Sequence, residues 1–250
     1  MLDFTITEWI IAGLCGATVG FAKTGIPGSG ILLPVLAALI IPARESTGFL
    51  LPMLVMGDIM AIAYWRRHVD WKKLIRLLPW AWAGVVTGFW GMNLISNNQL
   101  KIFIGVTVIL LMGLSWVRNH YFSDDRVPNH LLFVAFMGVL AGATSMMANA
   151  AGPVMVIYLM AMKLSKEDFI GTSAWFFGII NLSKLPFSLG LDLIDTASFT
   201  TNIILLPTIA IGGIIGIYTV HRVTQKGFNR VVIILALLAA LYLIVGQIVM

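Results

Sequence analysis

Two short stretches interrupt an otherwise apolar chain, and both carry residue types that bind anions. They read AKTGIPGSG at residues 22–30 and MANAAGP at residues 147–153. Glycine lets the backbone approach a ligand closely, and a lysine, hydroxyls and an amide add hydrogen-bond donors. The two stretches therefore predict one substrate site for an anion. We expect its members to be Lys23, Thr24, Gly25, Gly28, Ser29 and Gly30 from the first stretch, and Asn149, Ala150 and Gly152 from the second.

Two ionisable residues lie inside long apolar segments, where a charge is costly unless it is paired or hydrated. Asp58 lies in LPMLVMGDIMAIAYW and Lys184 in FFGIINLSKLPFSLG. Asn181 precedes Lys184 by three residues, so the two share one face of a helix. We expect Asp58 to lie near Lys184 or Lys23, with Asn181 and Lys184 adding to the anion site and Asp58 carrying a coupling proton. A structural ion pair and a lysine that snorkels to the membrane surface are the alternatives.

The elements that must position these residues are membrane helices. The chain of 250 residues is 59% hydrophobic and 11% charged, whereas soluble domains are about a quarter charged. Ten apolar segments can be marked, at residues 6–22, 29–41, 47–65, 74–95, 100–117, 130–147, 153–162, 168–188, 198–220 and 228–249. Two of them, 29–41 and 153–162, are shorter than the roughly 20 residues that span a bilayer, and each follows a break. We predict an all-α polytopic membrane protein with 8–10 membrane segments, in which these two are full spans or arms of re-entrant hairpins.

The second half of the chain resembles the first. LCGAT at 14–18 matches LAGAT at 140–144, and Pro27 matches Pro153 at the same offset. LLPWAWAGVVTG at 77–88 matches LLPTIAIGGIIG at 205–216. The matches predict a duplication into two repeats of five segments each. Residues 1–117 form the first, residues 118–129 a cytoplasmic linker, and residues 130–250 the second.

Charges in the loops predict the orientation of the repeats. Basic residues gather in RRHVDWKKLIR at 66–76 and in HRVTQKGFNR at 221–230, whereas the N-terminus and residues 189–197 carry acids and no base. The positive-inside rule then places the N-terminus outside. Five segments is an odd number, so the repeats are inverted. Broken helices in corresponding positions of inverted repeats are typical of a transporter's binding site at the membrane midplane, where two helix N-termini would attract an anion.

Four pairs of small residues have a simpler explanation. Gly16 and Gly20, Gly84 and Gly88, Gly138 and Gly142, and Gly212 and Gly216 are each separated by three residues. This spacing is typical of close helix packing in membranes. We expect the four pairs to hold helices together.

Other classes of function find little support in the sequence. The one cysteine, Cys15, allows neither a disulfide within the chain nor a cysteine metal cluster, and the four histidines lack metal-ligand spacing on one helix. No hydrolase or metalloprotease motif occurs, so we expect neither an enzyme nor a cofactor. The net charge of +5 comes mainly from Lys and Arg in loops between apolar segments, where membrane topology explains them, so we expect no nucleic-acid partner. We expect no removable signal peptide at the N-terminus.

The stretches GLCGATVGFAKTGIPGSGILLPVLAALIIPARES and GVLAGATSMMANAAGPVMVIYLMAMKLSKEDFIGTSA resemble the sulfite exporter TauE/SafE family. The second stretch departs from the family pattern, with NAAGP where a denser run of glycines is common. The resemblance implies secondary transport of small anions across the bacterial inner membrane, such as sulfite, sulfoacetate, other sulfonates or thiosulfate.

Together these observations predict a secondary anion transporter that works by alternating access. A passive channel, a membrane subunit that anchors a partner, and a transporter of cations or of another small solute stay open as alternatives. The expected partners are a small anionic substrate and the lipid bilayer, and assembly as a homodimer also stays open.

Overall fold

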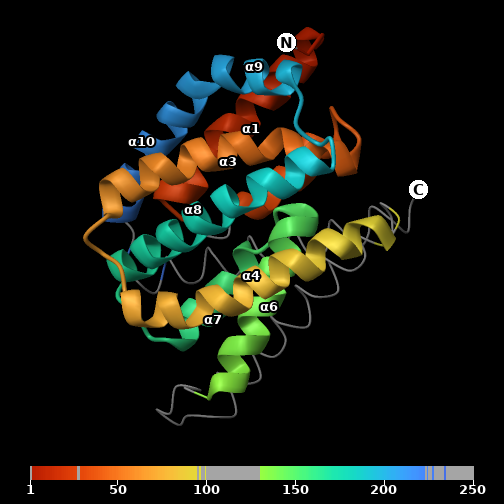
Figure 1. Ribbon diagram of the computed structural model, residues 1–250. Helices are drawn as coiled ribbons and strands as arrows, with labels where there is room; N and C mark the ends of the chain where they lie inside the picture. Colours follow the sequence, from red (N-terminus) through yellow and green to blue (C-terminus); the bar gives the residue numbers. More distant parts are fainter. Residues whose placement is uncertain are drawn as a thin grey trace.

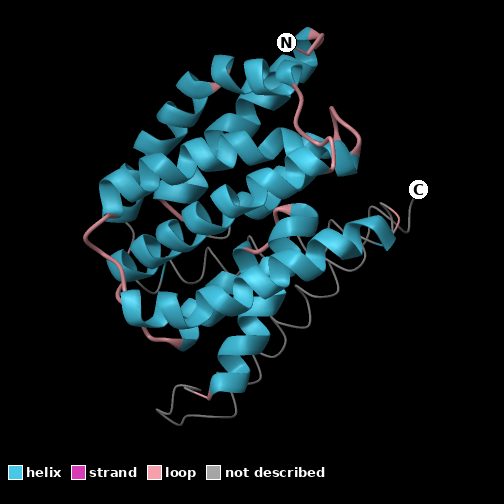
Figure 2. Ribbon diagram, viewed as in Figure 1, coloured by secondary structure: helices cyan, strands magenta, loops and turns pink. Residues whose placement is uncertain are grey.

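The computed structural model describes residues 2–26, 29–94 and 130–222, together with the isolated positions 96, 99, 224, 227 and 234. Within these residues all regular secondary structure is helical (Figure 2), as predicted. The expected segment 100–117, the linker 118–129 and, apart from residue 234, the expected segment 228–249 lie outside the described residues.

The helices follow the apolar segments closely. The first part of the chain forms α1 (Ile6–Thr24), a 3-10 turn η1 (Ser29–Leu32), α2 (Leu33–Ala38), α3 (Ala43–Trp65) and α4 (Trp71–Leu94). The second part forms α6 (Leu131–Ala148), α7 (Gly152–Ala161), α8 (Lys166–Gly190), α9 (Thr196–Ile204) and α10 (Leu206–Arg222). Side-chain caps define several starts: Thr5 and Glu8 form a capping box at α1, and Asp195 caps α9.

One expected segment, 198–220, differs from a single straight helix. It forms α9 and α10, which are bent by 50° at Leu205. Pro207 lies in the first turn of α10 and has no backbone N–H to donate to the preceding turn. Such a missing hydrogen bond is a common cause of sharp helix bends. It explains how the chain bends here although the apolar pattern continues without a break.

Small residues bring two pairs of helices into close contact. α1 packs on α10 and α4 packs on α6. A Cβ atom added to Gly20 would lie 2.0 Å from the carbonyl oxygen of Ile209, and one added to Gly142 would lie 1.9 Å from that of Ala81. The expectation that the four glycine pairs serve packing is confirmed, because each pair meets backbone or Cβ atoms of the facing helix.

The centre of the molecule is built by α3 and α8. They run side by side between the α1–α10 pair and the α4–α6 pair (Figure 1). Each break lies at the end of a long helix, after α1 and after α6, and the chain then folds back as η1–α2 or as α7. The two breaks thus approach the same central pair of helices.

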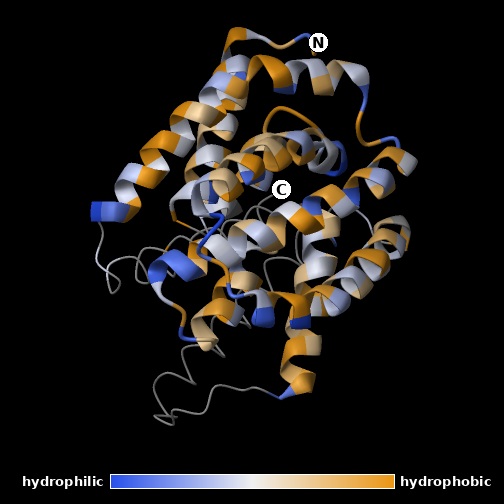
Figure 3. Ribbon diagram, turned by 60° about the vertical axis from the view of Figure 1, so that its left-hand side comes forward, coloured by the Kyte–Doolittle hydropathy of each residue, from blue (hydrophilic) through white to orange (hydrophobic). Residues whose placement is uncertain are grey.

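The outer surface has the character of a membrane protein. Within the described residues, Arg44–Trp65 and Leu131–Ala148 are each long and apolar enough to cross a bilayer, and the bent α9–α10 pair would be a third span. Large apolar side chains face outward along several helices, among them Trp90, Phe136 and Ile214. Figure 3 shows hydrophobic residues distributed along the helices rather than only between them.

Candidate functional site

A buried ion pair joins the end of α1 to the middle of α3. The Nζ atom of Lys23 lies 2.7 Å from Oδ1 of Asp58, and the Asp58 side chain is only 1% exposed. The second carboxylate oxygen, Oδ2, accepts a hydrogen bond of 2.7 Å from Nδ2 of Asn181 on α8. The expected proximity of Asp58 to Lys23 is therefore found. Asp58 is held by one residue from each half of the chain.

Lys184 continues this network from α8 to the second break. Its Nζ donates hydrogen bonds to Oδ1 of Asn149 at 2.6 Å, to Oγ of Ser145 at 3.1 Å and to Oδ1 of Asn181 at 3.2 Å. All three acceptors are neutral, so the Lys184 ammonium is solvated by dipoles rather than cancelled by a carboxylate. With Lys23, Lys184 and Asp58 ionised, the network carries one net positive charge.

Local backbone structure explains why the two breaks present Lys23 and Asn149. Lys23 lies in the last turn of α1, where the helix dipole favours a cation. Asn149 ends α6 in the left-handed conformation, with φ 52° and ψ 29°, which asparagine tolerates better than most residues. Its Nδ2 donates to the carbonyl oxygen of Thr47 on α3 at 2.9 Å, which fixes the amide.

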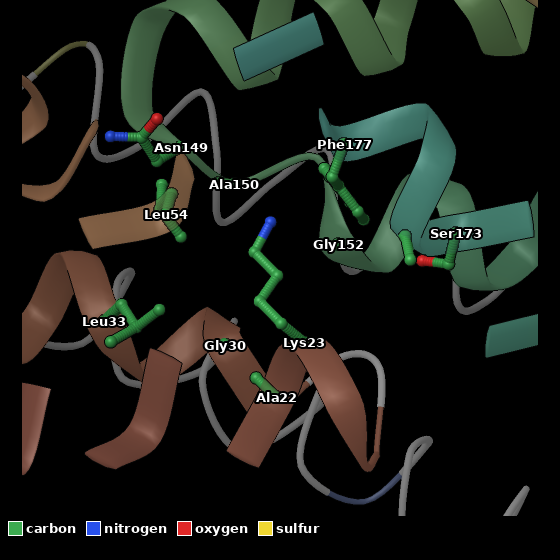
Figure 4. Close-up of a pocket in the computed structure, with 11 residues that line it drawn as sticks. Ala22, Lys23, Gly30, Leu33, Leu54, Asn149, Ala150, Gly152, Ser173 and Phe177 are labelled. Carbon is green, nitrogen blue, oxygen red and sulfur yellow. The ribbon is translucent and has the colours of Figure 1, made fainter. Parts of the chain in front are cut away.

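A cavity of about 50 Å³ lies between the two breaks. A single water needs about 10–15 Å³ by the same measure, so the cavity has room for a few waters or one small oxyanion. Lys23 extends into it from below, Asn149 and Ala150 lie above, and Leu33 and Leu54 face Gly152 and Phe177 across it (Figure 4). Its lining residues are Ala22, Lys23, Gly30, Leu33, Leu54, Asn149, Ala150, Gly152, Ser173, Ala174 and Phe177.

The lining combines a cationic polar wall with an apolar one. The polar groups are the Lys23 ammonium, the Asn149 side chain and the Ser173 hydroxyl. α7 begins at Gly152, and the first N–H groups of a helix have no partner within it. Phe177 lies one turn from Ser173 on α8 and adds an apolar ring, whose centroid lies 4.2 Å from Nζ of Lys23. Such a surface suits an anionic head group with little bulk.

The remaining candidates from the sequence divide into neighbours of the cavity and packing residues. Asn181 and Lys184 support Asp58 and Asn149 from behind without lining the cavity. Thr24 donates to the carbonyl oxygen of Gly213 at 2.7 Å, and Ser29 donates to that of Ile26 at 2.8 Å. Gly25 lies against Gly216. Gly28 lies outside the described residues.

Sequence reasoning missed the contribution of the middle of α8. Ser173, Ala174 and Phe177 line the cavity, although none lies beside a break. Their spacing from Asn181 and Lys184 follows the three- and four-residue steps of one helix face. That periodicity was the signal that could have found them, because it continues the face of α8 that carries Asn181 and Lys184 by two turns.

A larger cavity of about 430 Å³ lies near the N-terminus and has the opposite charge. It is lined by five carboxylic acids, Asp3, Glu8, Glu45, Asp192 and Asp195, together with apolar residues of α3 and the 39–42 loop. Among the described residues no group of three or more histidines, cysteines or acids has a geometry that could hold a metal ion. Because ionised carboxylates repel an anion, the five acids make this cavity a poor candidate for anion binding.

Comparison with known proteins agrees with the character of the central site. The model of the sulfite exporter TauE/SafE family matches residues 9–243, nearly the whole chain. No curated protein and no solved structure gives a significant match.

Proposed function

Since this chain belongs to the sulfite exporter TauE/SafE family, we propose that it is a secondary transporter that moves a small sulfur oxyanion or organosulfonate, such as sulfite or sulfoacetate, across the bacterial inner membrane. The family describes integral membrane transport of this kind of anion, and the apolar helices agree with it. The substrate within this class and the mechanism below are our proposal.

One observation carries the proposal: a single cavity is lined by residues of both breaks, with Lys23 on one side and Asn149 and Gly152 on the other. Unpaired backbone is tolerated at membrane depth only inside the protein or along a cavity. The cavity therefore accounts for the position of the two breaks. A purely structural turn would need neither a lysine nor an enclosed space beside it.

Alternating access by two inverted repeats is the mechanism that we propose. The helix pairs support it, because α1 of the first repeat packs on α10 of the second, and α6 of the second packs on α4 of the first. Each repeat thus packs one of its helices against a helix of the other repeat, through close contacts at glycines in both pairs. Rocking of one repeat against the other would expose the cavity first on one side and then on the other.

The position of Asp58 supports the proposal that it carries a coupling proton. A carboxylate buried between Lys23 and Asn181 can release Lys23 when it gains a proton.

The basic loop at 66–76 supports an orientation with the N-terminus outside. In that orientation Lys23 lies in the last turn of the first descending helix, and Asn149 caps the end of the first ascending helix of the second repeat.

Uptake of radiolabelled sulfite into proteoliposomes tests the proposal. The expected result is saturable flux that depends on a proton gradient, is lost in Lys23→Gln and persists in the surface control Lys73→Gln. Current that follows voltage alone would indicate a passive channel. Flux of cations without flux of any anion would favour the acidic cavity as the functional one and would overturn the proposal.

A further inference from the structure

Asp58 lies so close to the anion-binding lysine that it must influence which anions bind there. Lys23 lines the cavity and is 9% exposed, whereas Asp58 is 1% exposed and does not line it. An anion in contact with Nζ of Lys23 would approach within about 3 Å of that atom. Since Oδ1 of Asp58 is 2.7 Å from the same atom, the two negative charges would be within about 6 Å of each other.

The two oxygens of the carboxylate have different partners. Oδ1 lies 2.7 Å from the ammonium of Lys23 in the buried ion pair, whereas Oδ2 accepts a hydrogen bond from Asn181. Asn181 also accepts a hydrogen bond from Lys184. Asp58 is thus fixed by Asn181, and its attraction to Lys23 can be exchanged for attraction to a ligand.

The charges around Asp58 can be counted. Of the described helices that pack against α3, α1 contributes Lys23 and α8 contributes Lys184 as the titratable groups that face Asp58. α6 and its C-terminal cap contribute the neutral Ser145 and Asn149, and α10 contributes Gly213 beside Met60. The other two, α2 and α9, contain no ionisable residue. Two cations and one carboxylate leave one positive charge. A monoanion in the cavity brings the buried sum to zero, whereas a dianion leaves one excess negative charge.

From this geometry we propose that Asp58 sets the charge selectivity of the site: the ionised carboxylate admits a monovalent oxyanion, and a divalent oxyanion enters only when Asp58 carries a proton. This inference rests on the proposed function and deepens it. Asp58 acts as an internal competitor for Lys23 and is a specificity-determining residue rather than a ligand of the substrate. The same competition links substrate charge to proton movement, since a dianion would travel with one proton and a monoanion with none.

Methanesulfonate and sulfate form a matched pair of probes for this inference. Both are tetrahedral oxyanions of similar size, and neither gains or loses a proton near neutral pH, so their charges differ by one throughout the experiment. Binding to the purified full chain is measured by isothermal calorimetry as pH is lowered from neutral to mildly acidic. At neutral pH we expect sulfate to bind at least about tenfold more weakly than methanesulfonate, because it adds a second negative charge near Asp58.

The pH dependence and one variant complete the test. Acidification should strengthen sulfate binding and change methanesulfonate binding little. In Asp58→Asn, which keeps the size and polarity of the side chain, sulfate should bind at neutral pH at least as well as methanesulfonate, and its pH dependence should vanish. The wild-type comparison stands alone if the variant does not fold.

Two results would overturn the inference in distinguishable ways. Equal binding of sulfate and methanesulfonate by the wild-type protein at every pH would leave an anion site without charge selection. Binding of neither probe, together with no binding of sulfite, would remove the anion site itself and the proposed function with it.

Discussion

Lys23 and Asn149 occupy corresponding positions in the two halves of the chain, 126 residues apart, and both line the same cavity. They differ in charge, yet a continuous set of contacts connects them through Asp58, Asn181 and Lys184. Because the connection passes through α3 and α8, a shift of one break must change the surroundings of the other. This linkage is the physical basis for the alternating exposure of the cavity that we propose.

Removal of the Lys23 charge should weaken anion binding. Lys23→Met keeps much of the aliphatic length but removes the donor that contacts the ligand, and a charge-assisted hydrogen bond contributes about 1.5–3 kcal/mol. We expect affinity for sulfite to fall by at least about tenfold. Thermal stabilisation by sulfite measures the effect.

The same variant should also lose stability, since it leaves Asp58 buried without its cation. Breaking a buried pair costs about 3–5 kcal/mol. The double variant Lys23→Met with Asp58→Asn should recover most of the stability without recovering binding. Full binding in the double variant would show that Lys23 is structural. Lys73→Met is the matched control for loss of a lysine, because Lys73 forms a partly exposed ion pair with Asp70 at the start of α4.

Close packing of α4 and α6 should depend on Gly142. An alanine Cβ at this position would lie 1.9 Å from the carbonyl oxygen of Ala81, so the helices would have to separate. We expect Gly142→Ala to destabilise the protein by about 1–3 kcal/mol, the range for overpacked cores. Gly190→Ala is the control, because nothing lies within 4 Å of the added atom. Equal melting temperatures for the two variants in detergent would contradict the packing described above.

The cap of α9 should make stability fall in acid. The backbone N–H of Ser198 donates to Oδ1 of Asp195 at 2.6 Å, and this hydrogen bond holds the pKa of the Asp195 carboxyl below its usual value. A lowered pKa in the folded state means that the contribution is complete at neutral pH. It begins to fade near the unfolded value of about 3.9 and is lost as pH falls through the folded one.

Replacement of Asp195 should therefore separate capping from charge. Asp195→Ala should lose about 1 kcal/mol at neutral pH and show a smaller further loss in acid than the wild type. Asp195→Asn should keep most of the cap at neutral pH and likewise lose this part of the acid dependence. Melting temperatures of the three proteins between neutral pH and about pH 3 provide the measurement. Parallel curves for all three would show that Asp195 contributes no pH dependence.

Lys184 should stabilise the second break rather than bind the substrate directly. Lys184→Met leaves the oxygens of Asn149, Ser145 and Asn181 without their shared donor, and unsatisfied buried groups cost about 1–3 kcal/mol each. We expect faster hydrogen exchange of residues 147–153, with a smaller loss of sulfite affinity than in Lys23→Met. An unchanged exchange rate together with complete loss of binding would instead assign Lys184 to the substrate.

Much of the fold was accessible from the sequence because the bilayer restricts the alternatives. Within the described residues the apolar segments became helices to within a few residues, and the glycine pairs at Gly84 and Gly212 became contacts, since only small residues allow such approach. The breaks were visible as glycine, proline and asparagine clusters. The bend between α9 and α10 was not, because Pro207 alone also fits the first turn of a straight helix.

The site was accessible only in part. The ionisable residues Lys23, Asp58 and Lys184 stood out against an apolar background, and their rarity predicted that Asp58 lies near one of the two lysines without saying which. Which side chains face the cavity depends on the rotation of α8 and α1 about their axes, and the sequence fixes that rotation only through packing partners. Thr24 illustrates the point, because its hydroxyl turns to α10 although the neighbouring Lys23 faces the cavity.

Anomalous diffraction from crystals soaked in selenite, a heavier analogue of sulfite, tests the central claim most directly. The account predicts one strong selenium peak in the cavity, within hydrogen-bond distance of Nζ of Lys23 and close to Asn149 and the start of α7 at Gly152, and the peak should disappear in Lys23→Met. A cavity without selenium, with selenite bound only at the basic loops or beside α9, would contradict it.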